Sequence, residues 1–415
     1  MNETAPVSGG CPISHGFTPF EPSYVADPYP YFNKLREETP VAYSPEYDLY
    51  MVSRFDDITA VLKNRDVFSA ANSTIAFSKI APAAQAILAS GFPRKPTFTN
   101  ADAPRHTAMR SAASKCLTHK RWKSVQPVIT GFVEARIADM KGKDVIDLGA
   151  DIIFPTTSYA GFSLLGFPEE DIPMLFSWCG KRVMMTYGEL GEDDQVIAAQ
   201  QLVDFWSYCR DFVRMREKNL VDDLPSDLIR VANASNGAMD IEDVDNMIYS
   251  LSLASHETTA NAMLNGFYRL MQNRDVWNEL VADRSLIPGA VEELMRFDSP
   301  TITHRRLCKE DIEVGGVKIP AGATVMLMFG AGNHDPERFP DPEKIDIRRK
   351  NAIEHLAFGK NWHFCLGAPL ARFEIALVLG KLLEAMPGMR PADVPMVYNP
   401  VVLFRGPEKL LVHPA

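Results

Sequence analysis

Hydrophobic and polar positions along the chain predict a mostly helical protein with small sheets at one side. Segments with helical spacing of apolar residues lie at about 125–140, 150–165, 170–187, 195–219, 225–234, 241–273 and 288–297. Short segments expected to form strands lie at 41–43, 49–52, 312–314, 317–319, 324–329 and 401–412. The predicted fold class is mainly α, a helix-dominated α+β arrangement.

Length and composition favour one large domain for this pattern. The chain has 415 residues, of which 46% are hydrophobic and 23% charged, and no linker, repeat or low-complexity block divides it. Residues 1–20 are expected to form a flexible N-terminal arm, because their start is polar and contains Pro and Gly. Residues 21–415 are then predicted to form a single domain.

Charge and cysteine usage argue against several protein classes. The formal net charge of −10 speaks against nucleic-acid binding, because phosphate contacts require clustered Lys and Arg. The six cysteines are scattered without zinc-site spacing, which fits a reducing compartment. No apolar stretch reaches the roughly 18 residues that cross a bilayer, and no signal sequence opens the chain. We expect a soluble, cytoplasmic protein that does not bind a membrane.

A cysteine stands in a turn directly before the last long helical segment. Gly359 and Gly367 bracket this turn, and Pro369 suits the first turn of the helix that follows. Cys365 therefore lies where the positive end of a helix dipole favours a thiolate. A thiolate at this position is a nucleophile or a metal ligand, and no Ser/His/Asp or Cys/His/Asn pattern nearby suggests acyl transfer.

The segment 358–367 resembles the haem-ligand loop of the cytochrome P-450 superfamily, whose usual pattern is Phe-Gly-x-Gly-x-His-x-Cys-x-Gly. The matching positions are Phe358, Gly359, His363, Cys365 and Gly367. The resemblance extends over nearly the whole chain. It implies the cytochrome P-450 fold, haem b as cofactor, Cys365 as the ligand of its iron, and Phe358, His363 and Gly367 as cofactor-binding residues. Asn361 replaces a family glycine, and we expect it to strain or reshape the loop.

An acid and an alcohol interrupt the apolar run of the long helix expected at 241–273. Glu257 and Thr258 are adjacent, and such a pair suits proton delivery within hydrogen-bond reach. The segment resembles the family's oxygen-activation motif, which makes Glu257 and Thr258 the catalytic residues. Ser255 replaces the usual second glycine, which leaves the size of the oxygen groove open. His256 adds a second group that could carry protons.

Cations are expected to bind the two haem propionates, because arginine forms charge-assisted, forked bonds with carboxylates. By resemblance the candidates are His106, Arg110, Arg306 and His363. His106 and Arg110 lie four residues apart on one predicted helix, so both can face one carboxylate. Arg306 is expected just before a strand.

A second charged motif is expected to be structural. Glu293 and Arg296 match the family's Glu-x-x-Arg pair, which is thought to hold the core of the cysteine loop. The segment 336–339 resembles the motif of the third partner, but its distance from the loop argues against it. We expect Lys344 to be the third partner, or His355 to complete the pair instead.

The resemblance implies a bacterial haem-thiolate monooxygenase that activates O₂ and hydroxylates or O-dealkylates a small hydrophobic, aromatic substrate. Segments 8–14, 256–261, 286–293, 346–349 and 404–407 resemble the haem domain of bacterial enzymes fused to a phthalate-dioxygenase-type reductase. The chain stops after Ala415, so a separate NAD(P)H-dependent flavin/iron-sulfur reductase or ferredoxin is expected to supply electrons. A basic run, proposed to dock that partner, contains Lys115, His119, Lys120, Arg121 and Lys123.

Two alternatives to the monooxygenase remain open. One is a peroxide-using peroxygenase, which typically has an Arg-Pro pair in place of Glu257 and Thr258. The other is a non-catalytic haem sensor, which would not need that pair. The substrate pocket is expected to contain Ile80, Phe98, Met184, Met185, Tyr187, Leu253, Ile302 and Phe404.

Overall fold

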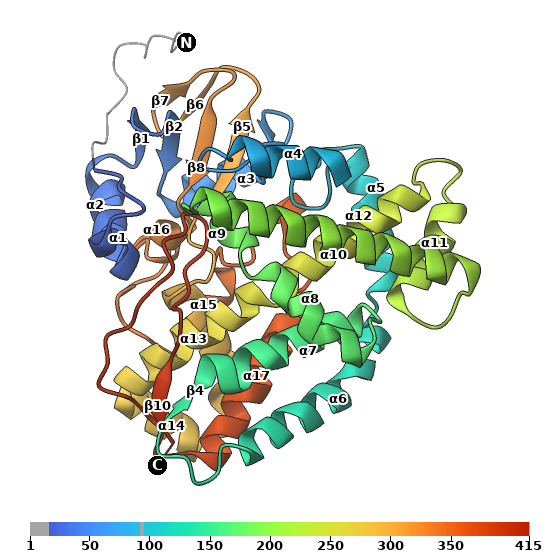
Figure 1. The fold of residues 1–415 in the computed structure, drawn as a ribbon. Helices are drawn as coiled ribbons and strands as arrows, with labels where there is room; N and C mark the ends of the chain where they lie inside the picture. Colours follow the sequence, from blue (N-terminus) through green and yellow to red (C-terminus); the bar gives the residue numbers. More distant parts are fainter. Residues whose placement is uncertain (1–15, 92–94, 415) are drawn as a thin grey trace.

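Helices make up most of the molecule, and the strands gather at one side of it (Figure 1). The structure, a computed structural model, describes residues 16–91 and 95–414. The helices before residue 140 are α1 (Pro22–Ala26), α2 (Tyr29–Glu38), α3 (Phe55–Lys63), α4 (Pro82–Gly91), α5 (Arg105–Cys116) and α6 (His119–Ala138). The helices between residues 150 and 300 are α7 (Phe154–Leu164), α8 (Ile172–Cys179), α9 (Arg182–Tyr187), α10 (Glu192–Lys218), α11 (Leu224–Asn233), α12 (Ile241–Ala254), α13 (Glu257–Gln272), α14 (Arg274–Ala282) and α15 (Ile287–Phe297). Two more follow, α16 (Phe329–Asn333) and α17 (Ala368–Ala385).

A five-stranded sheet pairs strands from residues 41–69 with strands from residues 304–327. Its strand order is β1-β2-β8-β5-β3, with β1 (Val41–Ser44), β2 (Leu49–Val52), β3 (Phe68–Ser69), β5 (His304–Cys308) and β8 (Thr324–Leu327). The β2–β8 pair is parallel, with Leu49 opposite Thr324, and the other pairs are antiparallel. This pairing places β5, which carries Arg306, next to the segment after β3.

Two smaller sheets complete the strands. One contains β4 (Ile146–Asp147), β9 (Arg390–Pro391) and β10 (Leu411–His413), and the other is the hairpin of β6 (Ile312–Val314) and β7 (Val317–Ile319). The hairpin turns at Gly315 and Gly316, whose φ values are +55° and +81°. Two successive positive φ angles define a two-residue hairpin turn that favours glycine.

Local sequence signals explain where several helices begin. Asp240 accepts a hydrogen bond from the amide of Asp243, and Asp243 accepts one from the amide of Asp240, which closes a capping box at the start of α12. Asp223 caps α11 in the same manner through the amide of Ser226. Pro369 lies in the first turn of α17, as its position after the cysteine turn predicts.

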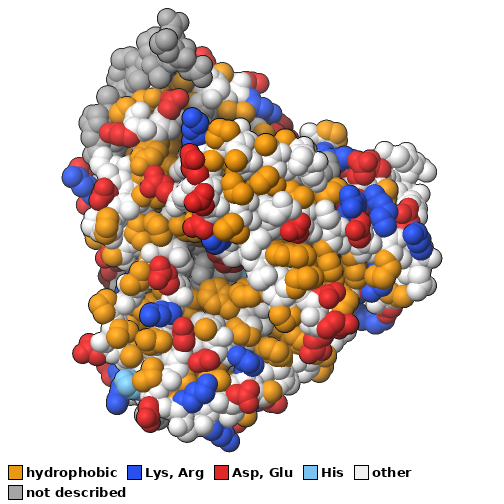
Figure 2. All heavy atoms as spheres, viewed as in Figure 1, with side chains coloured by type: hydrophobic (Ala, Val, Ile, Leu, Met, Phe, Trp, Pro, Cys, Tyr) orange, Lys and Arg blue, Asp and Glu red, His pale blue; other side chains and the backbone are white. Residues whose placement is uncertain are grey.

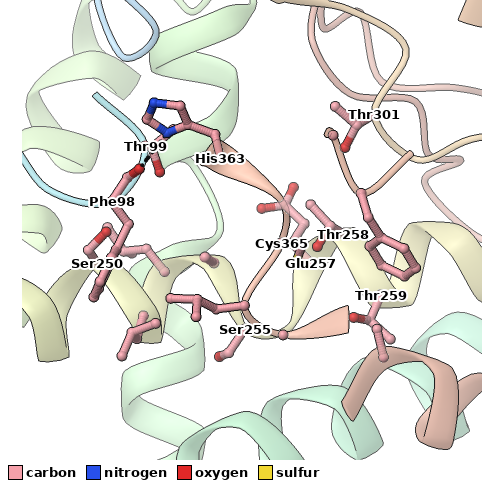
Figure 3. A pocket seen from close by; sticks show the side chains of 18 of the residues that line it. Phe98, Thr99, Ser250, Ser255, Glu257, Thr258, Thr259, Thr301, His363 and Cys365 are labelled. Atoms are coloured by element: carbon pink, nitrogen blue, oxygen red, sulfur yellow. Dashed lines mark hydrogen bonds between the residues drawn. The ribbon is translucent and has the colours of Figure 1, made fainter. Parts of the chain in front are cut away.

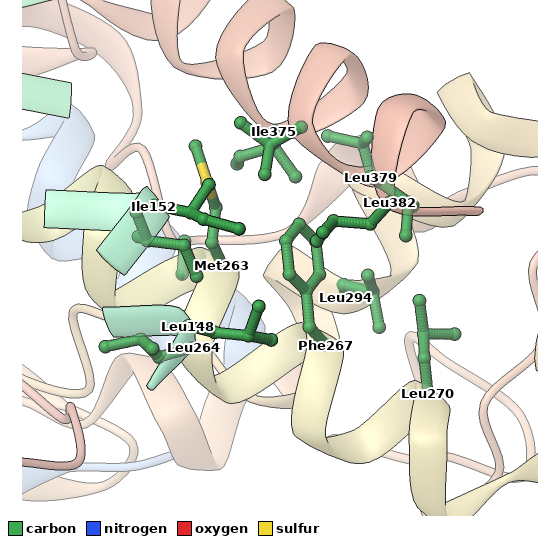
Figure 4. Packing of buried hydrophobic residues seen from close by; sticks show 14 of the residues in the cluster. Leu148, Ile152, Met263, Leu264, Phe267, Leu270, Leu294, Ile375, Leu379 and Leu382 are labelled. Carbon is green, nitrogen blue, oxygen red and sulfur yellow. The ribbon is translucent and has the colours of Figure 1, made fainter. Parts of the chain in front are cut away.

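The largest buried cluster packs α13 against α17 and α15 (Figure 4). Phe267 of α13 is fully buried at its centre. The labelled side chains around it are Leu148, Ile152, Met263, Leu264, Leu270, Leu294, Ile375, Leu379 and Leu382. Because α17 directly follows the cysteine turn, this packing holds the turn against α13.

The predicted fold class is confirmed, and four element predictions need correction. The helix expected at 241–273 is interrupted at Ser255 and His256, so it forms α12 and α13. The helix expected at 170–187 is likewise divided into α8 and α9. Of the strand expected at 401–412, only β10 and isolated bridges form. Arg306 lies inside β5 rather than before a strand, because β8 and β3 pair with that segment on either side.

The expected N-terminal arm lies largely outside the described residues, as do residues 8–14 of the reductase-fused resemblance. Beyond residue 15, Phe17 is buried and packs edge-on against Tyr24 and Tyr47. No helix in the described ranges is long and apolar enough to span a bilayer. The face drawn in Figure 2 carries acidic and basic side chains interspersed with hydrophobic ones, and neither sign forms a broad field there.

Candidate functional site

A cavity of about 420 Å³ lies between the cysteine turn and the junction of α12 and α13. Cys365, Glu257, Thr258, Arg110 and Arg306 all line it. The sequence places these residues up to 255 positions apart, and the folded chain brings them to one space. Figure 3 shows that Cys365, Glu257 and Thr258 lie near one another, with His363 and Phe98 at one side.

Two left-handed residues shape the cysteine turn. Gly359 has φ +66° and Asn361 has φ +56°, and a single turn of 3₁₀ helix follows at Asn361–His363. Asparagine is one of the few residues with a side chain that adopts this conformation readily. The amide of Cys365 donates to the carbonyl of Phe358 at 2.9 Å, which closes the turn. Asn361 therefore substitutes for the expected glycine without opening the loop.

Burial and the start of α17 act in opposite directions on the thiol of Cys365. Burial raises its pKa above the usual value, although the amides of Gly367 and Ala368 and the guanidinium of Arg110 act in the opposite direction. The helix N-terminus thus favours a thiolate as predicted, but withdrawal from water outweighs it in the protein by itself. A metal ion at the sulfur would reverse this balance, because a coordinating thiol is deprotonated.

The four predicted propionate ligands form one cluster at the edge of the cavity, and Arg110 and Arg306 make it cationic. The rings of His106 and His363 have their centroids 4.2 Å apart, and Nδ1 of His363 lies 3.0 Å from the carbonyl oxygen of Phe98. Arg110 donates to the carbonyl of Phe364, within the cysteine turn. Burial, together with Arg306 and His106, lowers the pKa of His363 to about 3.

This cluster has unused capacity for an anion. Nε2 of His106 is buried and has no hydrogen-bond partner among the described residues. Arg306 has no carboxylate partner in the described ranges, and burial lowers its pKa to about 10. The Asp102 carboxylate acts on Arg306 only from beyond ion-pair distance, so the charge of this buried cation is incompletely compensated. The cluster therefore fits a ligand that carries carboxylates. A flat apolar group with acidic substituents, such as haem, matches both the cavity and its cationic edge.

Glu257 and Thr258 open α13 and face the same cavity. Neither side chain has a hydrogen bond to another described residue, so both are free to contact a ligand or water. Burial raises the pKa of Glu257 to about 7, and Arg182 of α9 opposes that shift. A carboxyl with this pKa holds a proton and can also release it near neutral pH.

Comparisons with known proteins are in agreement with this geometry. A family model described as cytochrome P-450 matches residues 192–387. The cytochrome P-450 monooxygenase PikC of Streptomyces venezuelae is 32% identical over 394 residues, which cover 92% of this chain and 90% of PikC. The chain belongs to the cytochrome P-450 family. It is therefore a monooxygenase of a family whose members use haem.

Solved cytochrome P-450 structures superpose closely on the chain. An intact type IV self-sufficient cytochrome P-450 monooxygenase matches with a TM-score of 0.94 and 32% identity, over 98% of this chain and 54% of that one. The chain thus spans about half the length of that enzyme. A second P-450, CREJ in complex with (4-ethylphenyl) dihydrogen phosphate, matches with a TM-score of 0.91 and 30% identity, over 96% of this chain and 99% of that one.

The buried ion pair of this P-450 has a different third partner from the one predicted. Arg296 donates twice to Glu293, at 2.8 Å each, and both side chains are fully buried. Nε of Arg349 donates to Oε1 of Glu293 at 3.1 Å. Lys344 contributes only its backbone carbonyl, to which Arg296 donates at 3.3 Å. The prediction of Lys344 was wrong, because distance along the sequence does not show which side of a turn faces inward.

His355 does not complete this pair either. Its Nε2 lies 3.4 Å from a carboxylate oxygen of Glu292, the neighbour of Glu293, and Arg372 donates to the same carboxylate at 2.5 and 2.9 Å. Arg338 of the 336–339 segment pairs with Glu354, so that segment is indeed not the third partner.

Most of the predicted pocket residues line the cavity of this P-450. Phe98, Met185, Tyr187, Leu253 and Phe404 do so, whereas Ile80, Met184 and Ile302 do not. Ile302 is instead buried in the cluster beneath the five-stranded sheet, and Ile80 packs against the cluster of α4 and α10.

Sequence reasoning missed many of the polar residues that line the cavity, among them Arg182, His304 and Glu374. His304 lies two residues before Arg306 on β5, so the period of a strand could have placed both on one face. Glu374 is fully buried on α17, and neither of its carboxylate oxygens has a partner among the described residues. Burial raises the pKa of Glu374 well above the usual value, because withdrawal from water disfavours the charged carboxylate.

Proposed function

We propose that this P-450 holds haem b through Cys365 and inserts one oxygen atom from O₂ into a small aromatic substrate. The observation that carries the proposal is that Cys365, the cations Arg110 and Arg306, and the pair Glu257–Thr258 all border one cavity. His106, whose buried Nε2 has no hydrogen-bond partner among the described residues, lies against His363 of the same lining. When bound, haem supplies the activation of O₂ with two electrons, and a thiolate ligand favours cleavage of the O–O bond.

The residues of the cationic cluster would bind and orient the cofactor. His106, Arg110, Arg306 and His363 are proposed to receive its two propionates, and Phe358 and Gly367 to border the ligand cysteine. The ring of Phe358 is fixed by the guanidinium of Arg372, whose carbon lies 4.7 Å above it. A Cβ at Gly367 would lie 3.8 Å from the sulfur of Cys365, so glycine keeps the space beside that atom open.

Glu257 and Thr258 are proposed to deliver protons. The Glu257 carboxyl has a pKa of about 7 and can therefore donate a proton and regain it from water during turnover. The Thr258 hydroxyl can order a water molecule and pass the proton into the cavity. This pair supports the monooxygenase over the peroxygenase and the sensor, since neither alternative needs a proton source at this position.

The proposed substrate is a small alkylphenol or aryl ether. Phe98, Tyr187 and Phe404 give the cavity aromatic walls, and such walls suit a flat apolar ligand. The related P-450 CREJ binds an ethylphenyl phosphate, which supports an aryl group of this size.

A separate electron donor, either a ferredoxin or an NAD(P)H-dependent flavin/iron-sulfur reductase, is proposed to dock on the basic run. Lys115, Lys120 and Lys123 are exposed there. Arg121 is already paired with Asp227 at 2.5 Å and Asp222 at 3.3 Å, so its charge is engaged within the chain. The three lysines are therefore the better candidates for an acidic partner. A cytoplasmic location likewise remains a prediction from the sequence.

The test is a titration of the ferric, haem-loaded protein with a panel of compounds, followed by product analysis. We expect 4-ethylphenol and 4-methoxybenzoate to shift the iron from low to high spin, because an aromatic ligand displaces water from the cavity. Long-chain fatty acids and bulky macrolides are expected to give smaller shifts. A larger shift with either of those classes would overturn the aromatic assignment. If none of the compounds in the panel gave an oxygenated product, the proposed oxygen insertion would be overturned.

A further inference from the structure

The break between α12 and α13 lies directly before the proposed proton-delivery pair. α12 ends at Ala254 and α13 begins at Glu257, with His256 at φ −126° and ψ −50° between them. Ser255 holds the end of α12, because its hydroxyl donates to the carbonyl of Ser252 at 3.0 Å. The direction in which Glu257 and Thr258 leave the backbone therefore depends on how Ser255 and His256 are held.

Two consecutive residues of α7, Gly161 and Phe162, contact the two residues of the break, Ser255 and His256. The side chain of Ser255 fills the space over Gly161, where an added Cβ would lie 2.3 Å from Oγ and 2.6 Å from Cβ of Ser255. The ring of Phe162 lies 5.3 Å from the ring of His256, centroid to centroid. On the other side of His256, the ring of Phe176 lies at 5.7 Å.

These contacts assign packing roles to both residues of the break. In Figure 3 the Ser255 side chain points away from Cys365, Glu257 and Thr258. His256 is 2% exposed, and burial lowers its pKa to about 4, so it is uncharged near neutral pH. Ser255 thus packs its side chain against Gly161 of α7 at the cavity wall. His256 packs between Phe162 and Phe176 as an uncharged ring and is not a charged proton carrier.

We propose that Gly161 and Ser255 interlock, and that this interlock positions Glu257 and Thr258 for proton delivery. The inference deepens the proposed function and rests on it. Glycine inside a helix such as α7 is unfavourable relative to alanine, so Gly161 needs a reason in packing. The space required by Ser255 supplies that reason, because close-packed interiors leave no room for both a serine and a second Cβ. Gly161 and Ser255 are positioning residues, since neither is proposed to touch the reacting atoms.

The interlock predicts a specific pattern of damage and rescue. Gly161→Ala forces Ser255 out of its notch and displaces the start of α13. A shift of about 1 Å in a positioning element can cost up to roughly a hundredfold, and we expect a loss of about tenfold in product formed per nicotinamide oxidised. The double variant Gly161→Ala/Ser255→Gly removes the two contacts under 3 Å and leaves a 3.3 Å contact with the carbonyl oxygen of residue 255, so it is expected to recover most of that loss. Gly131→Ala in α6 is the matched control, because a Cβ at Gly131 meets no atom within 4 Å.

The assay uses haem-loaded protein with 4-ethylphenol as substrate, and a plant-type ferredoxin with its NADPH-dependent reductase as electron donors. Hydrogen–deuterium exchange of residues 254–260 is measured in parallel and needs no turnover. We expect faster exchange in Gly161→Ala than in the wild type, with recovery in the double variant. Unchanged coupling and exchange in Gly161→Ala would overturn the interlock, as would a double variant no better than the single one.

A Gly161→Ala variant that fails to fold would also be informative, because the double variant serves as its comparison. If Gly161→Ala does not bind haem, the double variant decides: haem binding there supports the interlock, and the same failure contradicts it. Different results would contradict the interlock and the proposed function. A Thr258→Ala enzyme that stays coupled would contradict proton delivery by the pair, whereas the exchange pattern of residues 254–260 would still report on the interlock.

Discussion

Arg349 donates from Nε to the fully buried carboxylate of Glu293 at 3.1 Å, and this contact extends the Glu293–Arg296 pair into a three-residue network. The network also reaches the cysteine turn. Arg296 donates to the carbonyl of Asn333 at 2.9 Å, and the Asn333 side chain accepts from the amide of Leu356 at 2.7 Å, two residues before Phe358. Buried charge therefore supports the segment that presents Cys365.

Removal of Arg349 should weaken this support strongly. Arg349→Ala takes one partner from a buried carboxylate, and we expect a loss of about 3 kcal/mol in the free energy of unfolding, with poorer haem retention. Chemical denaturation and the haem-to-protein absorbance ratio measure both effects. Lys344→Ala is the control, because Lys344 is exposed and contributes only its backbone carbonyl; its change should stay within about 0.5 kcal/mol. Equal losses in the two variants would contradict the network.

Cys365 should be the iron ligand. The reduced carbon monoxide complex of the wild type is expected to show the strongly red-shifted Soret band of thiolate-bound haem, and Cys365→His should abolish it. Cys308→Ala, which removes a buried thiol in β5, should retain the band. Retention of the band in Cys365→His would rule out the assignment.

Thr258→Ala should fold, bind haem and oxidise nicotinamide, but divert much of that oxidation into hydrogen peroxide. The physical reason is that the hydroxyl orders the water through which protons reach the cavity. Product and peroxide are measured per nicotinamide oxidised. Thr258→Ser keeps the hydroxyl and should stay close to the wild type. If Thr258→Ala and Thr258→Ser formed the same amount of product per nicotinamide oxidised, the hydroxyl would not be needed.

Glu257 should give turnover a pH dependence centred near its pKa of about 7, which burial raises. The carboxyl is protonated below that pH and ionised above it, so coupled turnover should fall as the pH rises through about 7. Glu257→Gln should be slower, by roughly a hundredfold, and should show no inflection there. The measurement is the rate of product formation between about pH 6 and pH 8.5, corrected for the electron donor's own profile. A wild-type inflection that survives in Glu257→Gln belongs to another group.

The same raised pKa has a consequence for stability. The carboxyl's folded-state pKa lies above its usual 4.5, so its contribution to stability is fully present below pH 4.5 and is lost as the pH rises through about 7. Glu257→Gln should therefore gain stability relative to the wild type on passing from about pH 5 to pH 8. Thermal midpoints of the haem-loaded proteins across that range test the sign, and a constant difference would contradict it.

Charge reversal at the exposed lysines should slow reduction. Lys120→Glu/Lys123→Glu is expected to lower the second-order rate of reduction by an acidic ferredoxin and to flatten its salt dependence. Arg121→Glu is a less suitable probe, because it also breaks the ion pairs with Asp227 and Asp222. Lys409→Glu, at an exposed lysine before β10 that has no ion pair among the described residues, is the comparison variant. A reduction rate that is unchanged in Lys120→Glu/Lys123→Glu would remove the basic run as the docking site.

Local patterns in the sequence were sufficient for the mainly helical fold class, most helix positions, the cysteine turn and the family. These depend on periodicity, on Gly and Pro at helix ends, and on residues close together in the chain, all of which a single sequence displays. The left-handed Asn361 also follows from local chemistry, since asparagine tolerates that conformation.

Contacts between distant segments were decided only by the tertiary structure. The sequence pointed to Lys344, but the turn at 340–349 directs a carbonyl inward and brings Arg349 back to Glu293. Likewise, the apolar run at 241–273 predicts one helix, whereas α7 supplies the glycine notch and the Phe162 ring that accommodate a break at Ser255 and His256. The physical reason is that a side chain's partner, burial and pKa depend on which surfaces meet across the core, and periodicity along one segment carries no information about the surface that faces it.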